Sequence, residues 1–250
     1  MAVAGHEVHV CRYREARTLL RWLGEDLRGL RVLDVAGGDG YWAGRARARG
    51  ARAVALDLAA AKLRYGRQLS APPVLIKGDA LELPFGDASF DRVMSICAIE
   101  HFDDGRRALD EMARVLAPGG ELVMSADALT LAEQWPRLYR AHCERYHVKR
   151  TYSHAELAAL LSARGLDVIA HQYQFRSRWA QRMYLGLSAH GGKFGFNAAA
   201  PATPLIAASD RAAHSDGGAI VLVRARRAGP PSARSQKVRR PPAAGQGGNC

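Results

Sequence analysis

Residues 32–40, Val32-Leu-Asp-Val-Ala-Gly-Gly-Asp-Gly40, decide the fold of this chain. A short apolar run carries Asp34 to its end, and a turn rich in glycine follows directly. Such a run indicates a buried strand, and glycines allow a tight turn and the close approach of a ligand to the backbone. Ligands of open α/β sheets bind at the carboxyl ends of the strands. The sequence therefore predicts a binding site at this end of the strand.

Apolar runs alternate with helical patterns on both sides of this turn. The alternation predicts an α/β fold, a seven-stranded and mostly parallel sheet with helices on both faces. Residues 6–28 place leucines on one face of a helix and Arg and Glu on the other, while residues 176–218 are a less regular insertion. The expected strands are 31–35, 53–57, 74–77, 90–96, 121–125, 166–174 and 219–224, and the other expected helices are 41–49, 59–68, 106–116 and 153–164.

The glycine turn alone fits two classes of enzyme. Gly38-Asp-Gly-Tyr-Trp-Ala43 matches the pattern GxGxxA of dinucleotide-binding proteins. Asp57 ends the second expected strand, where nicotinamide-dependent dehydrogenases and methyltransferases both hydrogen-bond a ribose. A dehydrogenase is disfavoured because no Tyr-x-x-x-Lys follows the fourth strand.

The motifs downstream favour the second class. Taken as an ordered set, they closely resemble class I S-adenosylmethionine-dependent methyltransferases, which have a Rossmann-like fold, and especially the branch that includes the ubiquinone and menaquinone biosynthesis methyltransferases. The resemblance is strong over about residues 30–126, weaker from 153 to 174 and in the last strand, and absent from 177–218 and the tail. The motifs that carry it are Gly78-Asp-Ala80, Leu83-Pro-Phe-Gly-Asp-Ala-Ser-Phe-Asp91, Glu100-His-Phe102 and Glu111-Met-Ala-Arg-Val-Leu-Ala-Pro-Gly-Gly120.

The resemblance implies S-adenosylmethionine as the cofactor and assigns the residues around its methionine and ribose. Asp34 would orient the loop and approach the amino group of the methionine moiety. Gly38 and Gly40 would lie against the methionine and ribose, and Asp57 would accept hydrogen bonds from both ribose hydroxyls. Ala36 stands where the family usually has the first glycine, and we expect its methyl group to fit if the residue keeps an ordinary φ.

The same resemblance assigns the residues around the adenine and the sulfonium. Leu58 would pack on the adenine ring, Asp79 would accept from its amino group, and the backbone of Ala80 would read the ring. Residues 95–97, which end at Cys97, would pass beneath the reacting sulfonium. No metal is implied.

The acceptor side is less defined. His101 follows the fourth strand and is a weak candidate for a general base, because its intrinsic pKa suits proton transfer; a lining role is the alternative. Tyr146, His147 and Arg150 are candidates for the lining of the acceptor pocket. The alternative interpretation is that they belong to a solvated helix and loop with ordinary charges. Residues 178–187 interleave basic and apolar side chains, which fits a lid, a membrane-surface contact or a packed amphipathic helix.

Composition bounds the class of protein. The chain of 250 residues is 48% hydrophobic with a net charge of +12, and seven basic residues with no acidic one lie from Arg224 to the end. The other residues then carry only +5, which weakens the case for a nucleic-acid partner. Cys11, Cys97, Cys143 and Cys250 form no CxxC pair, as expected of reduced thiols in the cytoplasm, and we see no secretory signal.

These observations predict one methyltransferase domain over residues 1–227, with a variable insertion or lid at about 177–218, and a basic disordered tail over 228–250. The expected activity is methyl transfer to a small molecule, such as a quinone precursor, a polyketide or other secondary metabolite, a sugar or a lipid-linked intermediate. An RNA or other nucleic-acid methyltransferase, or a cofactor-binding protein without turnover, stays open. The site of methylation (O, N or C) and the oligomeric state are not specified.

Overall fold

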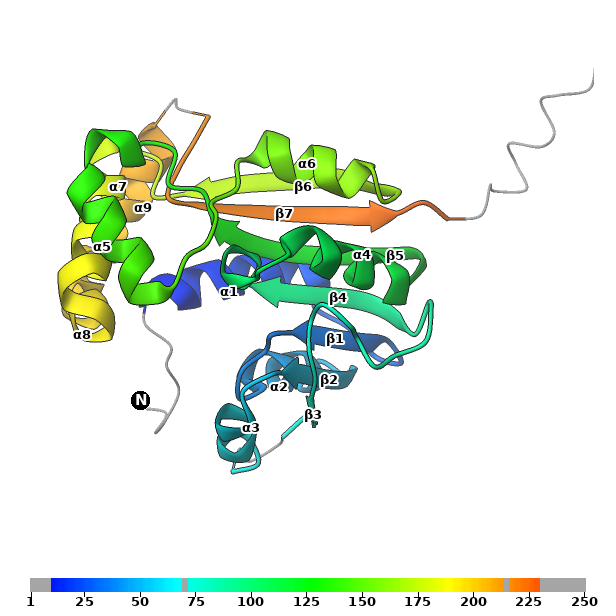
Figure 1. Ribbon diagram of the computed structural model, residues 1–250. Helices are drawn as coiled ribbons and strands as arrows, with labels where there is room; N and C mark the ends of the chain where they lie inside the picture. Colours follow the sequence, from blue (N-terminus) through cyan, green and yellow to red (C-terminus); the bar gives the residue numbers. More distant parts are fainter. Residues whose placement is uncertain (1–9, 69–71, 214–215, 230–250) are drawn as a thin grey trace, which may run out of the picture.

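The computed structural model describes residues 10–68, 72–213 and 216–229. Their strands form one seven-stranded sheet in the order β3-β2-β1-β4-β5-β7-β6, in which only β7 runs antiparallel to its neighbours (Figure 1). The expected α/β architecture is confirmed. The strands are β1 (Arg31–Val35), β2 (Arg52–Asp57), β3 (Val74–Lys77), β4 (Phe90–Ile96), β5 (Leu116–Asp127), β6 (Leu166–Gln174) and β7 (Ile220–Arg227).

Helices cover both faces of the sheet and bury two separate apolar cores. On one face α1 (Val10–Leu23) and α2 (Tyr41–Arg47) pack their alanines and leucines on the strands. On the other, α4 (Gly105–Val115) and α6 (His154–Ser162) do the same. The remaining helix near the glycine loop, α3 (Ala60–Gly66), follows β2. Two covered faces explain why the strands read as continuous apolar runs rather than as alternating ones.

The order of the strands reverses between β1 and β4: β2 and β3 follow on one side of β1, and β4 and β5 on the other. β1 pairs with both β2 and β4, and all three run parallel. The connections that follow β1 and β4 therefore both begin at the carboxyl edge of the sheet, next to each other. This switch point is where open α/β sheets bind their ligands.

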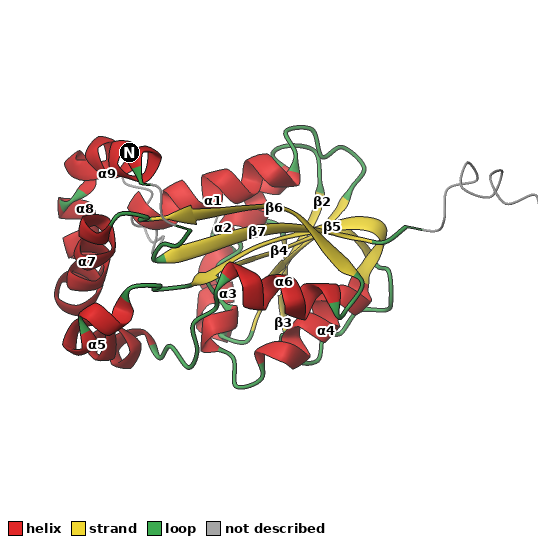
Figure 2. Ribbon diagram, turned by 90° about the horizontal axis from the view of Figure 1, so that it is seen from above, coloured by secondary structure: helices red, strands yellow, loops and turns green. Residues whose placement is uncertain are grey.

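A group of helices lies beyond the carboxyl ends of the parallel strands, at the left of Figures 1 and 2. It consists of α5 (Pro136–Tyr146), α7 (Arg178–Gly186), the π-helical turn η3 (Leu187–Gly191), α8 (Gly192–Ala198) and α9 (Thr203–Ala212). The packed amphipathic helix that was one interpretation of residues 178–187 is present as α7, and further helices follow in the part of 176–218 that looks less regular in the sequence. Their apolar residues pack against one another and α1 rather than forming one simple stripe, so no single period stands out.

Other element ends also differ from the sequence pattern. The first helix stops at Leu23 instead of residue 28, because Gly24 has a φ of 129° and leaves the helical region. The fifth strand begins at Leu116 and includes Pro118, Gly119 and Gly120, which were expected only to end the preceding helix. The capping box of Ser153 and Glu156 is present at the start of α6.

Part of the basic C-terminal segment belongs to the sheet. Arg224 and Arg226 lie in β7 and both bond Glu121 of β5, with Nε–Oε distances of 2.9 Å and 3.1 Å. Counting them with a free tail was therefore wrong. The expected disordered tail falls from residue 230 onward outside the described residues. In the described part, no helix combines the length and apolar character that a membrane span requires.

Candidate active site at the carboxyl edge

The turn after β1 is built around the side chain of Asp34. The carboxyl group is almost fully buried, and a Cβ atom on Gly37 would lie 2.6 Å from its Cγ and from its Oδ2. Gly37 has no left-handed φ, so the lack of space alone requires glycine there. Gly40 needs glycine for two reasons: its φ is 76°, and a Cβ would lie 2.6 Å from Leu75.

Burial changes the acidity of Asp34. Desolvation raises its pKa to about 8, a hydrogen bond from the Ala43 backbone opposes this shift, and the nearby charges of Asp57 and Asp39 add to it. Within the described chain, its Oδ2 has no hydrogen-bond partner. An ammonium group placed at this oxygen would be favoured, because it would satisfy the oxygen and offset the carboxylate charge.

Asp57 ties the glycine turn to the end of β2. Its Oδ2 accepts from the backbone N–H of Gly38 at 2.8 Å, and its Oδ1 accepts from that of Ala59 at 2.8 Å. A carboxylate has about four acceptor positions, so two remain for a ligand. The structure thus brings Asp34, Gly38 and Asp57 together, as the sequence predicted, while their roles toward a cofactor stay predictions.

The conformation of Ala36 corrects one expectation. Its φ is 57°, in the left-handed region, rather than the ordinary value expected for a residue that replaces glycine. An alanine there costs about 1–2 kcal/mol relative to a right-handed conformation. The turn keeps the geometry that a glycine would adopt freely, so the substitution adds strain.

The third strand end is more open. Asp79 is exposed, and its Oδ1 accepts from the backbone of Leu81 at 2.9 Å. Ala80 is buried, and Leu58, next to Asp57 in the chain, is an apolar side chain with 64% of its surface exposed. An exposed leucine beside a polar strand end offers an apolar surface for an aromatic ring.

Two of the quoted motifs hold this edge in place. Glu111 on α4 accepts from the backbone of Leu83 at 2.7 Å, and Arg114 donates to Glu111, Asp87 and two loop carbonyls. The neighbouring guanidinium lowers the pKa of Glu111. The two motifs therefore brace the loop after β3, a structural role that the resemblance did not assign.

Cys97, the first residue after β4, lies between this edge and a cavity on its other side. It has a φ of 44°, and its Sγ lies 3.0 Å from Oε1 of Glu15. Its backbone N–H donates to Oγ of Ser125 at 3.0 Å. Glu15, assigned by the helical pattern to the polar face of α1, is only 1% exposed.

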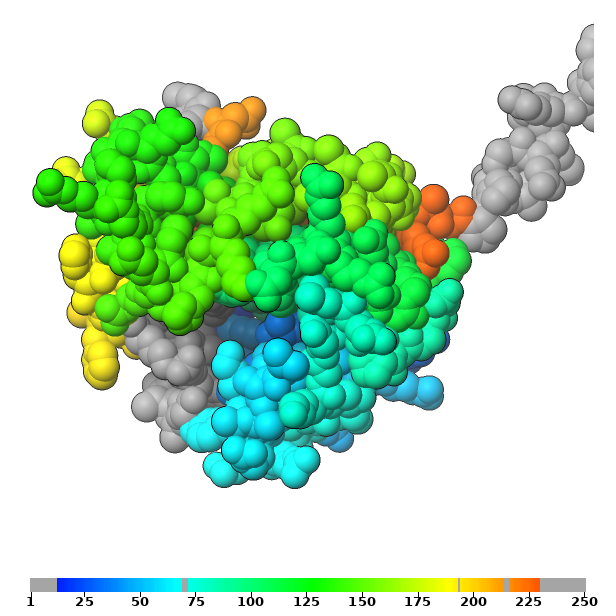
Figure 3. All heavy atoms as spheres, viewed as in Figure 1, coloured from blue at the N-terminus to red at the C-terminus, as the bar shows by residue number. Residues whose placement is uncertain are grey.

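A small cavity of about 40 Å³ begins at Cys97. Figure 3 shows the neighbouring surface hollowed between the green residues around α5 and the light-blue residues around α3. His101 and Tyr146, two of the four pocket candidates, line the cavity. Its lining consists of Cys97, Glu100, His101, Asp127, His142, Tyr146, Tyr184, Ser188 and Phe196.

A buried hydrogen-bond network forms one wall of this cavity. Nε2 of His142 lies 2.7 Å from Oδ2 of Asp127, and Nδ1 lies 2.8 Å from Oγ of Ser188. The Tyr184 hydroxyl donates to Oδ1 of Asp127 at 3.1 Å. The four side chains come from β5, α5, α7 and η3, and all are buried. The network fixes α5, α7 and η3 to the end of β5.

The other two pocket candidates lie elsewhere. His147 ends α5 with a φ of 55° and is exposed. Arg150 donates to Glu156 at 3.1 Å and lies over the ring of Tyr152. Neither is among the residues that line the cavity. Glu100, from the quoted motif Glu100-His-Phe102, lines the cavity and is only 1% exposed.

The sequence analysis missed Glu15, Asp127, His142, Tyr184 and Ser188. They come from five elements and form no contiguous motif, so spacing could not bring them together. One signal was available for Asp127, because it ends the fifth strand as Asp34 and Asp57 end the first two. For the others, we find no pattern in the sequence that distinguishes them from surface polar residues.

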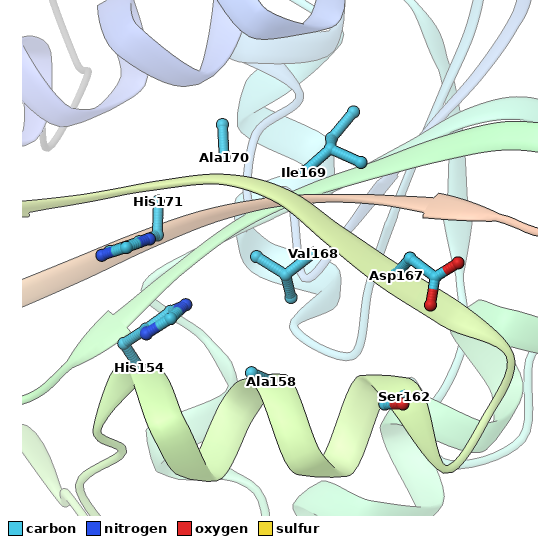
Figure 4. A pocket seen from close by; sticks show the side chains of 8 residues that line it. All are labelled: His154, Ala158, Ser162, Asp167, Val168, Ile169, Ala170 and His171. Carbon is cyan, nitrogen blue, oxygen red and sulfur yellow. The ribbon is translucent and has the colours of Figure 1, made fainter.

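A second hollow lies at the far edge of the sheet, between α6 and β6 (Figure 4). It is an open groove of about 370 Å³, and the rings of His154 and His171 stack at its end with centroids 3.6 Å apart. β5 and β7 separate it from β4 and hence from Cys97. It does not belong to the site at the carboxyl edge.

The comparisons with known proteins agree with this geometry. The model of the methyltransferase domain family matches residues 33–124. The malonyl-[acyl-carrier protein] O-methyltransferase of Erwinia pyrifoliae is 38% identical over 120 residues, which cover 45% of this chain and 46% of the relative. The demethylmenaquinone methyltransferase of Mycobacterium sp. (strain KMS) is 39% identical over 114 residues, covering 46% and 49%. The chain thus matches about half the length of these relatives.

Solved structures match over a longer range. The geranyl diphosphate C-methyltransferase of Streptomyces coelicolor A3(2) has a TM-score of 0.64 at 17% identity, covering 86% of this chain and 76% of that one. The S-adenosylmethionine-dependent methyltransferase of Mesorhizobium loti has a TM-score of 0.60 at 20% identity, covering 84% and 96%. At these identities the match shows the fold. The chain therefore has the fold of the class I methyltransferases, and the model of the methyltransferase domain family matches it over residues 33–124.

Proposed function

We propose that this protein transfers a methyl group from S-adenosylmethionine to a small-molecule acceptor. The observation that carries the proposal is that two halves of one site lie next to each other at the carboxyl edge of the sheet. Asp34, the glycine turn and Asp57 form the first half, and Cys97 leads from it into the lined cavity of the second half. The family match over residues 33–124 and the similar curated methyltransferases support the same activity.

The residues of the first half fit this cofactor in charge and shape. Asp34 has a buried oxygen suited to the ammonium group of the methionine moiety. Asp57 keeps acceptor positions for the ribose hydroxyls. Leu58 exposes an apolar surface for the adenine, and Asp79 and Ala80 lie at the next strand end, within reach of the same ring in this proposal.

The chemistry divides between the bound cofactor and the chain. The cofactor supplies an already activated methyl group on a sulfonium, so the transfer is an in-line displacement. The chain's residues hold the acceptor in line, exclude water and accept a proton where the acceptor must lose one. Side chains of α5, α7 and η3 line the cavity and help to exclude water from it.

Calorimetry with S-adenosylhomocysteine tests the cofactor half directly. We expect binding to the wild-type protein and a loss of at least about tenfold for Asp57→Asn, because the weaker acceptor faces both the loop and the ribose. Asp103→Asn, at an exposed carboxylate that pairs with Lys149, is the matched control and should bind normally. Thermal unfolding of both variants separates lost binding from lost folding. The proposal would be contradicted if the protein bound NADH but did not bind S-adenosylhomocysteine.

A filter-binding titration with RNA at several salt concentrations tests the rival acceptor. Two arginines of the basic segment are paired with Glu121 inside the sheet, which leaves them less free for phosphate. We therefore expect weak binding that disappears when residues 230–250 are deleted. Tight RNA binding that survives the deletion would favour a nucleic-acid acceptor.

A further inference from the structure

The cavity beyond Cys97 has a strongly acidic wall. Glu100 and Asp127 line it, and Glu15 stands directly behind the thiol of Cys97. Facing oxygens of Glu100 and Asp127 and the Cys97 Sγ all lie within 4.8 Å of one another. Among the described lining residues there is no lysine or arginine, and the bases are the imidazoles of His101 and His142. Buried carboxylates in such numbers favour a positively charged occupant.

Aromatic rings complete the enclosure. Tyr146, Tyr184 and Phe196 line the same cavity. The rings of Tyr184 and Phe196 have centroids 5.5 Å apart, and Tyr146 lies 5.2 Å from the imidazole of His142. Aromatic faces attract cations through their quadrupole, and aromatic enclosures are a recurrent device for binding ammonium groups. Two independent features, acidic side chains and aromatic rings, thus select the same charge.

We propose that the methyl acceptor is an amine that enters this cavity as an ammonium group. The proposal rests on the proposed methyl transfer and names its substrate class. Carboxylate and phosphate acceptors are disfavoured on electrostatic grounds, since their negative charge would lie beside the buried carboxyl groups of Glu100 and Asp127. The volume of about 40 Å³ fits the reacting end of an amine and leaves the rest of the molecule toward the hollow of Figure 3.

The reaction balances with the groups at hand. The ammonium nitrogen loses one proton to the carboxylate of Asp127, which Tyr184 and His142 hold in place. Its freed lone pair forms a bond to the methyl carbon as the carbon–sulfur bond breaks. The electron pair of that bond stays on sulfur, which becomes a neutral thioether. The methylated amine leaves as an ammonium ion, and the proton on Asp127 passes to solvent.

Three probes of equal chain length test the charge preference. Butylamine, butanol and butyrate are titrated into protein saturated with S-adenosylhomocysteine, and binding is followed by ligand-observed nuclear magnetic resonance. We expect butylamine to bind and the other two to bind more weakly or not at all. Saturation with S-adenosylhomocysteine is measured first on the same sample. Failure at that first step contradicts the proposed function, whereas failure at the second contradicts only the amine.

Two charge-removing variants locate the binding. Glu100→Gln and Asp127→Asn keep the side-chain shape, and each should weaken butylamine binding by about tenfold or more while leaving butanol unchanged. Asp26→Asn, at an exposed ion pair with Arg28, is the matched control and should leave all three affinities unchanged. If Asp127→Asn unfolds, Glu100→Gln still decides, because that variant keeps the hydrogen bonds of Asp127 to His142 and Tyr184.

Three results would overturn the proposal. The first is butyrate or butanol binding as strongly as butylamine. The second is butylamine binding that is absent or unaffected by both variants. The third concerns a metal ion in place of the ammonium: if equilibrium dialysis shows one Zn²⁺ or Mg²⁺ bound per chain and lost in Glu100→Gln, the acidic wall is a metal site.

Discussion

A Cβ atom on Gly37 would lie 2.6 Å from the Cγ of Asp34, so the glycine and the carboxyl group fill one space between them. Gly37→Ala must displace Asp34 or the turn. We expect a loss of about 1–3 kcal/mol in the free energy of unfolding and at least about tenfold weaker binding of S-adenosylhomocysteine. Urea unfolding and calorimetry measure the two effects. Gly186→Ala, at a helical position with nothing within 4 Å, is the control and should be neutral or stabilising.

Proton release should accompany cofactor binding. Because burial raises the pKa of Asp34 to about 8, the carboxyl group is mostly protonated at neutral pH. An ammonium group at its Oδ2 favours the charged form, so the proton leaves when the ligand binds. Calorimetry with S-adenosylhomocysteine in two buffers of different ionisation enthalpy should show this release. In Asp34→Asn the observed heat should no longer depend on the buffer; a dependence that persists would assign the proton to another group.

Relief of backbone strain should make Ala36→Gly a stabilising variant. With a φ of 57°, the alanine occupies a conformation that glycine adopts without penalty. We expect a gain of about 0.5–1 kcal/mol in the free energy of unfolding, since the added freedom of the unfolded chain offsets part of the relief. The same exchange at Ala48, an exposed residue with a φ of −62°, should destabilise instead. Equal signs for the two variants would contradict the strain.

The buried network makes the Tyr184 hydroxyl important for stability. Tyr184→Phe removes the donor to Asp127 and leaves a buried carboxylate with one partner fewer. We expect a cost of about 1–3 kcal/mol by urea unfolding. Tyr13→Phe, at a half-exposed ring, should change stability by less than about 0.5 kcal/mol. A neutral Tyr184→Phe would show that the hydroxyl contributes nothing to holding Asp127.

Acid should weaken the fold through the stacked histidines of the far groove. Desolvation first, and then the charge of His171, lower the pKa of His154, with Asp216 opposing. The unfolded chain therefore takes up a proton near the ordinary histidine pKa of about 6.5 that the folded chain resists. Stability should be constant above that pH and fall below it. His154→Gln should make the fall shallower in thermal scans, whereas exposed His190→Gln should not.

The sequence predicted the parts of the fold that depend on neighbouring residues. Four strands, at 31–35, 74–77, 90–96 and 166–174, have the expected bounds. For 31–35 and 90–96 the reason is that buried parallel strands are continuous apolar runs. The Asp34 turn and Asp57 were found for the same reason: strand ends and glycines are local signals. The family resemblance is confirmed by the match over residues 33–124.

The acceptor side could not be predicted in the same way. Asp127 and Ser188 meet through His142 only because β5, α5 and η3 pack together, and no spacing in the sequence encodes that packing. Glu15 looked like a surface residue because its helical position alternates with arginines, yet the end of β4 covers it. Tertiary contacts between distant elements, rather than local pattern, decide these positions.

Gln174 and Ile220 pair directly as neighbours in the sheet, although about 45 residues separate them. The segment that contains α7, α8 and α9 therefore begins and ends at neighbouring positions of the sheet, as an inserted loop does. Changing the length or content of such a segment alters neither the register of β6 and β7 nor the turn that follows β1. The arrangement lets Tyr184, Ser188 and Phe196, which line the cavity, change while the turn at Asp34 stays the same.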